Sequence, residues 1–252
     1  MTGSEPQPGR YSPRPDVPRR IAHRGASAQA PENTIPAFEA AARLGATWVE
    51  FDVMLSADGV PVVIHDETLR RTTGVDGLVA QTHVADLMQL DAGRWFAPKF
   101  AGARIPSLSQ TLDALARLGL GANVEIKPTV GAEAETGRVV ARALADSWPV
   151  RLPPPVVSSF STVAIRAAHA CHPAHDYAPI FEHVPDDWPA HLDAVGGQAV
   201  HCNAQHLTRA KAQEILATGA AIRCYTVNDG KTATRLADWG VSTVFTDMPP
   251  SL

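Results

Sequence analysis

The chain has 252 residues, of which 45% are hydrophobic and 19% are charged, and this composition excludes wholesale disorder, a collagen-like repeat and a small disulfide-stapled fold. Lys and Arg number 22 against 26 Asp and Glu, so the net charge of −4 gives no basic footprint for nucleic acid or an anionic membrane. Three cysteines without the spacing of metal ligands argue against both a disulfide framework and a zinc site. A reducing compartment fits this usage best.

The first 18 residues are rich in proline and lack the apolar stretch of a secretory signal. No later run approaches the ~18 apolar residues that a membrane span needs. We therefore expect residues 1–18 to form a flexible tail and residues 19–252 to form one domain. We also expect a cytoplasmic protein with no stable membrane association, and a homo-oligomer is possible.

From residue 19 onward, short β-branched runs alternate with Ala- and Leu-rich segments of helical period, which is typical of a parallel sheet with crossover helices. The expected strands are 20–23, 47–53, 123–127, 155–158, 176–180, 199–202, 222–226 and 243–246. The expected helices are 35–44, 108–118, 132–146, 161–170, 185–193, 208–218 and 231–239. Eight strands with intervening helices predict an α/β fold, a TIM-type (β/α)8 barrel.

One further run, 60–64, follows the second strand too closely for a parallel crossover. The turn signal Asp58-Gly59 predicts an antiparallel hairpin that sets Asp52 roughly opposite His65. The next segment, about 66–107, is too long for an ordinary loop, so we expect an inserted cap over the barrel mouth. We expect the aromatic residues of this cap, Trp95, Phe96 and Phe100, either to select what the mouth accepts or to fill the cap's own small core.

Polar residues collect at the carboxyl ends of the first three predicted strands, where barrel enzymes build their sites. They are His23 and Arg24, then Glu50 and Asp52, then Glu125 and Lys127. Because side chains alternate along a strand, both members of each i, i+2 pair face the same side. Three carboxylates that face one point need a cation, and oxygen ligands favour Mg²⁺ or Ca²⁺ over zinc. Each pair alone is equally compatible with a solvated surface pair, but their convergence favours a site.

Three longer segments now resemble the glycerophosphodiester phosphodiesterase family in order and spacing: IAHRGASAQAPENTIPAF, WVEFDVMLSADGVPVVIHDETLRRTTG and NVEIK. Four shorter pieces, IPSL, SSFS, YTVN and FTDMP, are also similar to motifs of that family. The resemblance covers nearly the whole chain after the tail.

The resemblance implies metal-dependent hydrolysis of a small-molecule glycerophosphodiester to an alcohol and glycerol 3-phosphate. It implies His23 and His65 as the acid/base pair, Glu50, Asp52 and Glu125 as ligands of one Mg²⁺ or Ca²⁺, and Arg24 and Lys127 as phosphate-binding residues. Tyr225, where the family often has Trp, would contact the substrate. The headgroup, the ion, the assignment of acid and base, and the choice between direct water attack and a cyclic phosphate stay open.

The chemistry of a phosphodiester supports these roles independently. Fixed cations neutralise charge on the phosphoryl oxygens, and the alkoxide leaving group needs a proton from a positioned acid such as histidine. Elsewhere we expect Asn33 or Thr34 to cap the helix that Pro36 enters, with a direct site role for Glu32 as the alternative. We expect Asp247 to tie the barrel closed, with substrate contact as the alternative.

Two other functions compete with this interpretation. One is a related lipase-type or lyase-type phosphodiesterase that acts on intact lipids, for which the cap aromatics would have to form an apolar rim. The other is a catalytically silent barrel that binds phosphorylated ligands. A pair of acid/base histidines argues against the silent barrel, because a binding protein needs none.

Overall fold

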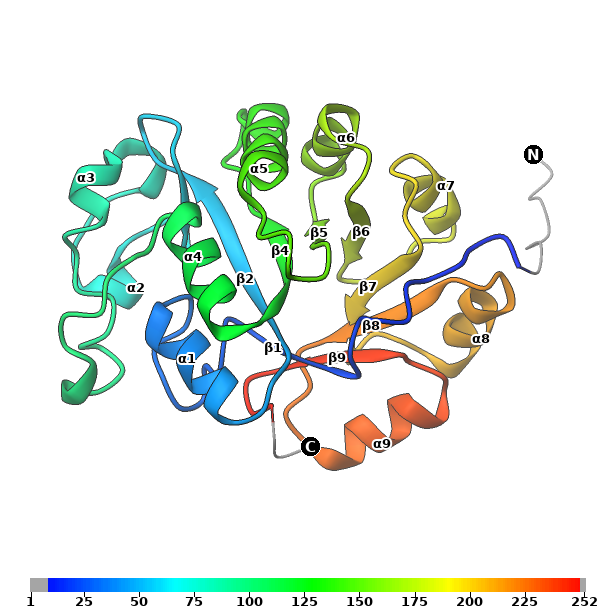
Figure 1. Ribbon diagram of the computed structural model, residues 1–252. Helices are drawn as coiled ribbons and strands as arrows, with labels where there is room; N and C mark the ends of the chain where they lie inside the picture. The colour runs from blue at the N-terminus through cyan, green and yellow to red at the C-terminus, as the bar shows by residue number, and fades with distance from the viewer. Residues whose placement is uncertain (1–8, 250–252) are drawn as a thin grey trace.

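Eight parallel strands close into a barrel in the computed structural model, which describes residues 9–249 (Figure 1). The barrel strands are β1 (Arg20–Ala22), β2 (Trp48–Leu55), β4 (Gly121–Ile126), β5 (Val156–Ser159), β6 (Asp176–Phe181), β7 (Ala199–Asn203), β8 (Ala221–Tyr225) and β9 (Thr243–Thr246), and one further strand is β3 (Pro61–Val63). Their order is β1-β9-β8-β7-β6-β5-β4-β2, the β1–β2 pairing closes the ring, and β3 lies antiparallel on β2. The predicted TIM-type barrel is confirmed.

Helices pack around the outside of this barrel (Figure 1). They are α1 (Ile35–Arg43), α4 (Leu108–Leu118), α5 (Glu133–Ser147), α6 (Thr162–Cys171), α7 (Trp188–Asp193), α8 (Arg209–Ala217) and α9 (Gly230–Asp238). The bounds of α4 follow from local chemistry, because Ser107 and Gln110 form a capping box at its start and Gly119 ends it in the left-handed conformation. Among the described residues, no helix combines the length and the apolar character that crossing a membrane requires.

The hairpin of β2 and β3 turns at Gly59, whose φ of +74° favours glycine. Val53 pairs with Val63, and the Ile64 N–H donates to the Asp52 carbonyl at 3.1 Å. Asp52 therefore lies opposite Ile64, so the expected position of His65 is off by one residue. His65 follows directly after the last paired residue, which places it at the barrel mouth.

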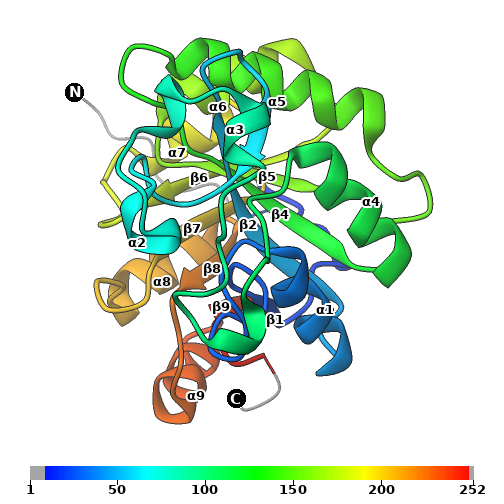
Figure 2. The same ribbon diagram turned by 90° about the vertical axis from the view of Figure 1, so that its left-hand side faces the viewer.

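The inserted cap contains α2 (Arg70–Thr73), η1 (Val79–Gln81), α3 (Val84–Leu87) and η2 (Pro98–Phe100). It lies at the left of Figure 1 and in front of the strands in Figure 2. Leu69, Val79 and Leu87 form its small core together with side chains of the hairpin.

The cap aromatics contact one another. The Trp95 and Phe96 rings meet edge to face with centroids 5.7 Å apart, and Phe96 meets Phe100 in the same way at 5.6 Å. The Trp95 indole N–H donates to the Ala92 carbonyl at 2.9 Å. None of the three lines the cavities described below, because this local packing holds them within the cap. The structure therefore does not support their expected role in headgroup selection.

Residues 9–18, assigned from the sequence to a flexible tail, lie against the barrel. Tyr11 is only 7% exposed, and its hydroxyl donates to Asp193 at 2.9 Å while its ring packs against Trp188. Arg14 donates to the Pro154 carbonyl at 2.9 Å. A proline-rich composition predicts poor secondary structure, but it does not prevent an aromatic anchor from docking. Residues 1–8 lie outside the described residues.

Strand β2 shows how the barrel positions the site. Val49, Phe51 and Val53 alternate outward and pack in the main core against the surrounding helices. The alternate residues, Glu50 and Asp52, therefore point into the barrel. The register with β4 sets Glu50 beside Asn123 and Asp52 beside Glu125. A separate apolar cluster is formed by side chains of β5 and β6 together with Ile21, Trp48 and Phe245.

Candidate active site

A cavity of about 150 Å³ opens at the carboxyl ends of the strands. Seven of the eight site residues expected from the sequence line it: His23, Arg24, Glu50, His65, Glu125, Lys127 and Tyr225. The eighth, Asp52, belongs to the carboxylate cluster at its edge. Residues from five different strand ends thus meet in one place, as the barrel geometry requires.

Glu50, Asp52 and Glu125 form this carboxylate cluster. Each offers one oxygen, and these oxygens lie within 4.8 Å of one another. Burial, followed by the neighbouring carboxylates, raises the pKa of Glu50 well above its usual range and that of Glu125 to about 8. Glu50 Oε1 is buried without a hydrogen-bond partner. An unpartnered oxygen among three crowded carboxylates fits a divalent cation with hard oxygen ligands.

Asp52 is held differently from the other two carboxylates. Burial raises the pKa of Asp52, but the positive charges of Arg24 and Lys127, together with the hydrogen bond from Asn33, outweigh burial and lower it. The Asn33 amide donates to Asp52 Oδ2 at 2.8 Å and accepts from the Asp52 N–H at 3.2 Å.

The predicted cap of α1 by Asn33 or Thr34 is therefore wrong. Thr34 occupies the N-cap position, but its side chain makes no capping hydrogen bond and donates instead to the Pro31 carbonyl at 2.6 Å. Asn33 bonds the carboxylate of Asp52 instead, since a charge-assisted hydrogen bond is stronger than a neutral cap.

His23 is oriented by Asp247, which follows β9. His23 Nδ1 lies 2.7 Å from Asp247 Oδ1, and Ser27 and Asn228 donate to the same carboxylate at 2.8 and 2.6 Å. Burial opposes ionisation of Asp247, but the hydrogen bond with His23 prevails and lowers its pKa to about 2. Because an ionised carboxylate only accepts, Nδ1 carries the proton, and Nε2 lies 3.9 Å from Glu50 Oε2.

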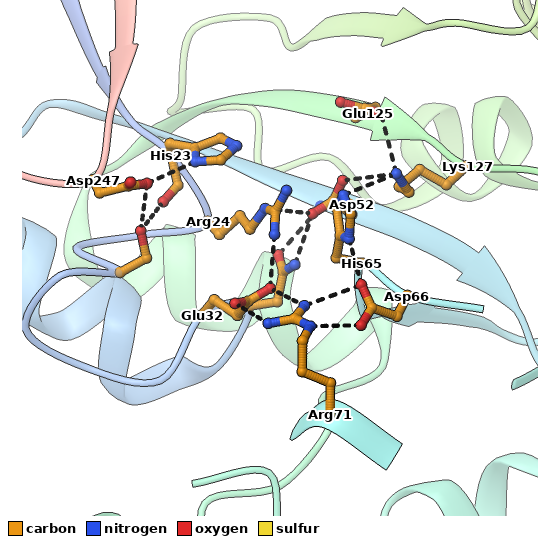
Figure 3. Close-up of polar contacts among 12 residues, drawn as sticks. His23, Arg24, Glu32, Asp52, His65, Asp66, Arg71, Glu125, Lys127 and Asp247 are labelled. Carbon is orange, nitrogen blue, oxygen red and sulfur yellow. Dashed lines mark hydrogen bonds and ion pairs between the residues drawn. The ribbon is translucent and has the colours of Figure 1, made fainter. Parts of the chain in front are cut away.

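His65 has the same arrangement (Figure 3). Its Nδ1 lies 2.6 Å from Asp66 Oδ1, and its Nε2 lies 3.1 Å from the Lys127 ammonium. Since a lysine ammonium only donates, Nε2 accepts, and the ring is neutral. Burial lowers the pKa of His65 in agreement with this form. Both histidines thus use Nδ1 for support, while Nε2 faces Glu50 in His23 and Lys127 in His65.

Arg24 connects the carboxylate cluster to the turn after β1. Its guanidinium donates to Glu32 at 2.8 Å and lies 3.3 Å from Asp52, and its backbone N–H donates to Glu50 at 2.9 Å. Arg24 has φ of +54°, a rare conformation for a residue with a side chain and a common sign of a functional site. The Arg24 Nε is buried without a hydrogen-bond partner.

Two aromatic side chains border the cavity. The Tyr225 hydroxyl lies 3.0 Å from the Phe181 carbonyl and 3.2 Å from the Glu182 carboxylate, both of them acceptors for its single proton, so its ring is fixed. Phe160 packs against this ring edge to face at 5.7 Å and is 50% exposed. A second, more open cavity of about 360 Å³ shares Glu125, Lys127 and Phe160 with the first.

Sequence reasoning missed the supporting contacts of Asn33, Asp66 and Asp247, and the place of Phe160 at the cavity. Two of them were adjacent to visible signals, since Asp66 follows His65 and Asp247 ends the last strand. The expectation that Asp247 has mainly a structural role is incomplete, because it supports His23 directly.

The chain matches the model of the glycerophosphoryl diester phosphodiesterase family over residues 23–251. The chain belongs to this family. A glycerophosphodiester phosphodiesterase of Bacillus subtilis (strain 168) is 31% identical, and the alignment covers 93% of this chain and 85% of that protein.

Solved structures agree with this membership in the glycerophosphoryl diester phosphodiesterase family. A phosphodiesterase of Oleispira antarctica, in complex with the product sn-glycerol-3-phosphate, is 37% identical with a TM-score of 0.89, over 92% of this chain and 94% of that chain. A glycerophosphodiester phosphodiesterase of Agrobacterium tumefaciens str. C58 is 29% identical with a TM-score of 0.76, over 93% and 98% of the two chains. The chain is therefore an enzyme of the glycerophosphodiester phosphodiesterase class.

Proposed function

We propose that this enzyme hydrolyses glycerophosphodiesters to an alcohol and sn-glycerol 3-phosphate with the help of one divalent cation, Mg²⁺ or Ca²⁺. The observation that carries the proposal is the meeting of two carboxylate-supported histidines with a three-carboxylate cluster in one cavity. The sn-glycerol-3-phosphate found with the Oleispira antarctica phosphodiesterase supports the product.

Glu50, Asp52 and Glu125 would hold the cation, which when bound neutralises charge on the phosphoryl oxygens. Arg24 and Lys127 line the same cavity and bind the phosphate, the first with a planar fork of donors and the second with a compact charge. Asp52 holds these two positively charged side chains in place, since its carboxylate lies 3.3 Å from the Arg24 guanidinium and 3.9 Å from the Lys127 ammonium. The fixed ring of Tyr225 forms a wall for the substrate.

His23 and His65 move the protons. One Nε2 takes the proton of the attacking hydroxyl as the new P–O bond forms. The other enters the step as the imidazolium and gives its Nε2 proton to the oxygen of the leaving alcohol as the old P–O bond breaks. Asp247 and Asp66 hold the two rings in the required orientation.

The test is the hydrolysis of glycerophosphocholine before and after exhaustive chelation, followed by addition of Mg²⁺ or Ca²⁺. We expect loss of activity on chelation and recovery with at least one ion. Glu125→Gln should weaken cation affinity while the fold persists, because the change is nearly isosteric. Glu135→Gln, in the first turn of α5 and exposed, serves as the control. Full turnover after verified metal removal would contradict the metal assignment.

The cytoplasmic location, the lack of stable membrane association and the homo-oligomer remain predictions from the sequence.

A further inference from the structure

Arg71 lies in α2 of the cap, where its guanidinium faces two carboxylates (Figure 3). It donates to Glu32 at 2.7 and 2.8 Å and to Asp66 at 2.6 and 3.0 Å. Four of its five N–H donors are thus used, two on each carboxylate. A guanidinium can hold two carboxylates in fixed planes, whereas an ammonium cannot.

Each of the two carboxylates leads to a different side chain of the catalytic cavity. Asp66 supports the His65 ring at 2.6 Å, and Glu32 accepts from the Arg24 guanidinium at 2.8 Å. His65 and Arg24 both line the catalytic cavity. One cap residue is therefore connected, through one carboxylate each, to an expected proton-transfer group and to an expected phosphate-binding group.

We propose that Arg71 is a positioning residue that fixes His65 through Asp66 and Arg24 through Glu32. The inference rests on the proposed function, because it assigns a purpose to the orientation of those two side chains. A displacement of about 1 Å in reacting groups can cost about 10²-fold in rate. The Arg71 side chain is 42% exposed, and partly exposed ion pairs add little to stability. Its loss should therefore reduce catalysis more than folding.

Arg70 offers a matched control, because it precedes Arg71 in the same helix and pairs only outward. Its partner is Asp76 at 2.8 Å, and the two side chains are 67% and 81% exposed. Arg71→Lys and Arg71→Gln should lower kcat for glycerophosphocholine by about 10- to 100-fold and raise KM. Arg70→Gln should leave both constants unchanged, with a melting temperature close to that of the Arg71 variants.

A double-mutant cycle separates positioning from a structural role. Arg71→Gln combined with Asp66→Asn should lose less kcat than the product of the two single losses, because both changes release the same His65 ring. For Arg71→Gln combined with Asp76→Asn, the loss of kcat should equal the product of the two single losses. The ¹⁵N shifts of the His65 ring should also change in Arg71→Gln and stay the same in Arg70→Gln, a readout that needs no substrate.

Several outcomes would overturn the inference: a normal kcat in folded Arg71 variants, an equal loss in Arg70→Gln, or multiplicative losses with Asp66→Asn. If the Arg71 variants fail to fold, the variants Asp66→Asn and Glu32→Gln test the inference in their place. A normal kcat in both would refute the positioning role of Arg71. A wild-type enzyme that cleaves no glycerophosphodiester would instead refute the proposed function. Wild-type activity with active Arg71 variants would refute this inference alone.

Discussion

The two histidines reach the same geometry from unrelated parts of the chain. His23 follows β1 and is held by a carboxylate from the end of β9, whereas His65 follows β3 and is held by its own neighbour, Asp66. In both rings the carboxylate fixes the Nδ1–H tautomer and leaves Nε2 as a proton acceptor. In His65 this acceptor faces the Lys127 ammonium at 3.1 Å. A pair of merely structural histidines would have no reason to share this arrangement at one carboxylate cluster.

His23→Ala and His65→Ala should each lower kcat by about 10²–10⁴-fold, the usual contribution of a general acid or base. KM should change less, because Arg24 and Lys127, which bind the phosphate, and the carboxylates that would hold the divalent cation remain. If the pair acts as a unit, the double variant should lose less than the product of the single losses. Steady-state kinetics under conditions where chemistry limits the rate would check this, and near-normal turnover in either variant would demote that histidine to a structural role.

Asp247→Asn tests the support of His23. The amide can donate to Nδ1 and so favours the other tautomer, which would remove the proton acceptor at Nε2. We expect kcat to fall by about tenfold or more, yet by less than in His23→Ala. Asp229→Asn is the control, because Asp229 caps the first turn of α9. The ¹⁵N spectrum of His23 should show the tautomer change in the first variant only, and an unchanged spectrum with full activity would contradict the role.

At the scale of elements, the open side of the site is bordered by the loop after β5. The aromatic residues of the cap do not border it. Phe160 lines both cavities, whereas Trp95 is held within the cap by Phe96 and by the Ala92 carbonyl. The alcohol part of a diester varies in size and needs an open space, so the shared wall at Phe160 is the surface that can discriminate between headgroups.

Phe160→Ala should therefore change the relative kcat/KM for choline, ethanolamine and glycerol diesters by about two- to tenfold, as expected for the loss of one apolar contact. Trp95→Ala should leave those ratios unchanged and lower the melting temperature, since its ring packs within the cap. Competition assays with substrate pairs would measure the ratios. Equal ratios in Phe160→Ala and the wild type would refute this assignment, and altered ratios in Trp95→Ala would restore the cap to headgroup recognition.

At the scale of the whole molecule, the sequence predicts the helices and strands that have a strong hydrophobic period. The barrel strands and surrounding helices lie within a few residues of their expected positions. Glu50, Asp52, Glu125 and Lys127 could be predicted because alternation on a strand fixes the side to which a side chain points.

Contacts between distant segments could not be predicted in the same way. The Asn33 amide bonds Asp52 because the turn after β1 folds over β2, and no local pattern distinguishes this from a helix cap. The contacts of Arg71 with Glu32 depend on how the cap docks. Tyr11 docks on α7 through one ring and one hydroxyl, a signal too small to see in a proline-rich segment.

The stability of the whole molecule should report the cation site through its pH dependence. In the metal-free protein the pKa of Glu125 is raised from 4.5 to about 8, and that of Glu50 is raised as well. Between about pH 4.5 and about pH 8, Glu125 binds more protons in the folded state than in the unfolded state. The raised pKa values of these carboxyls therefore make the free energy of unfolding fall as pH rises. Cation binding needs the ionised carboxylates, so it releases protons and stabilises more strongly at high pH.

We therefore expect the rise in melting temperature on addition of Mg²⁺ or Ca²⁺ to be larger at about pH 8 than at about pH 5. The lowered pKa of His65 acts in the opposite direction on absolute stability, because its folded state binds fewer protons than the unfolded state near pH 6. For this reason the measured quantity is the difference between cation-loaded and chelated samples in scanning calorimetry. Glu125→Gln should reduce both that difference and its pH dependence, while Glu135→Gln should retain them. A stabilisation that is equal at the two pH values, or greater at the lower one, would contradict a cation site built on these buried carboxyls.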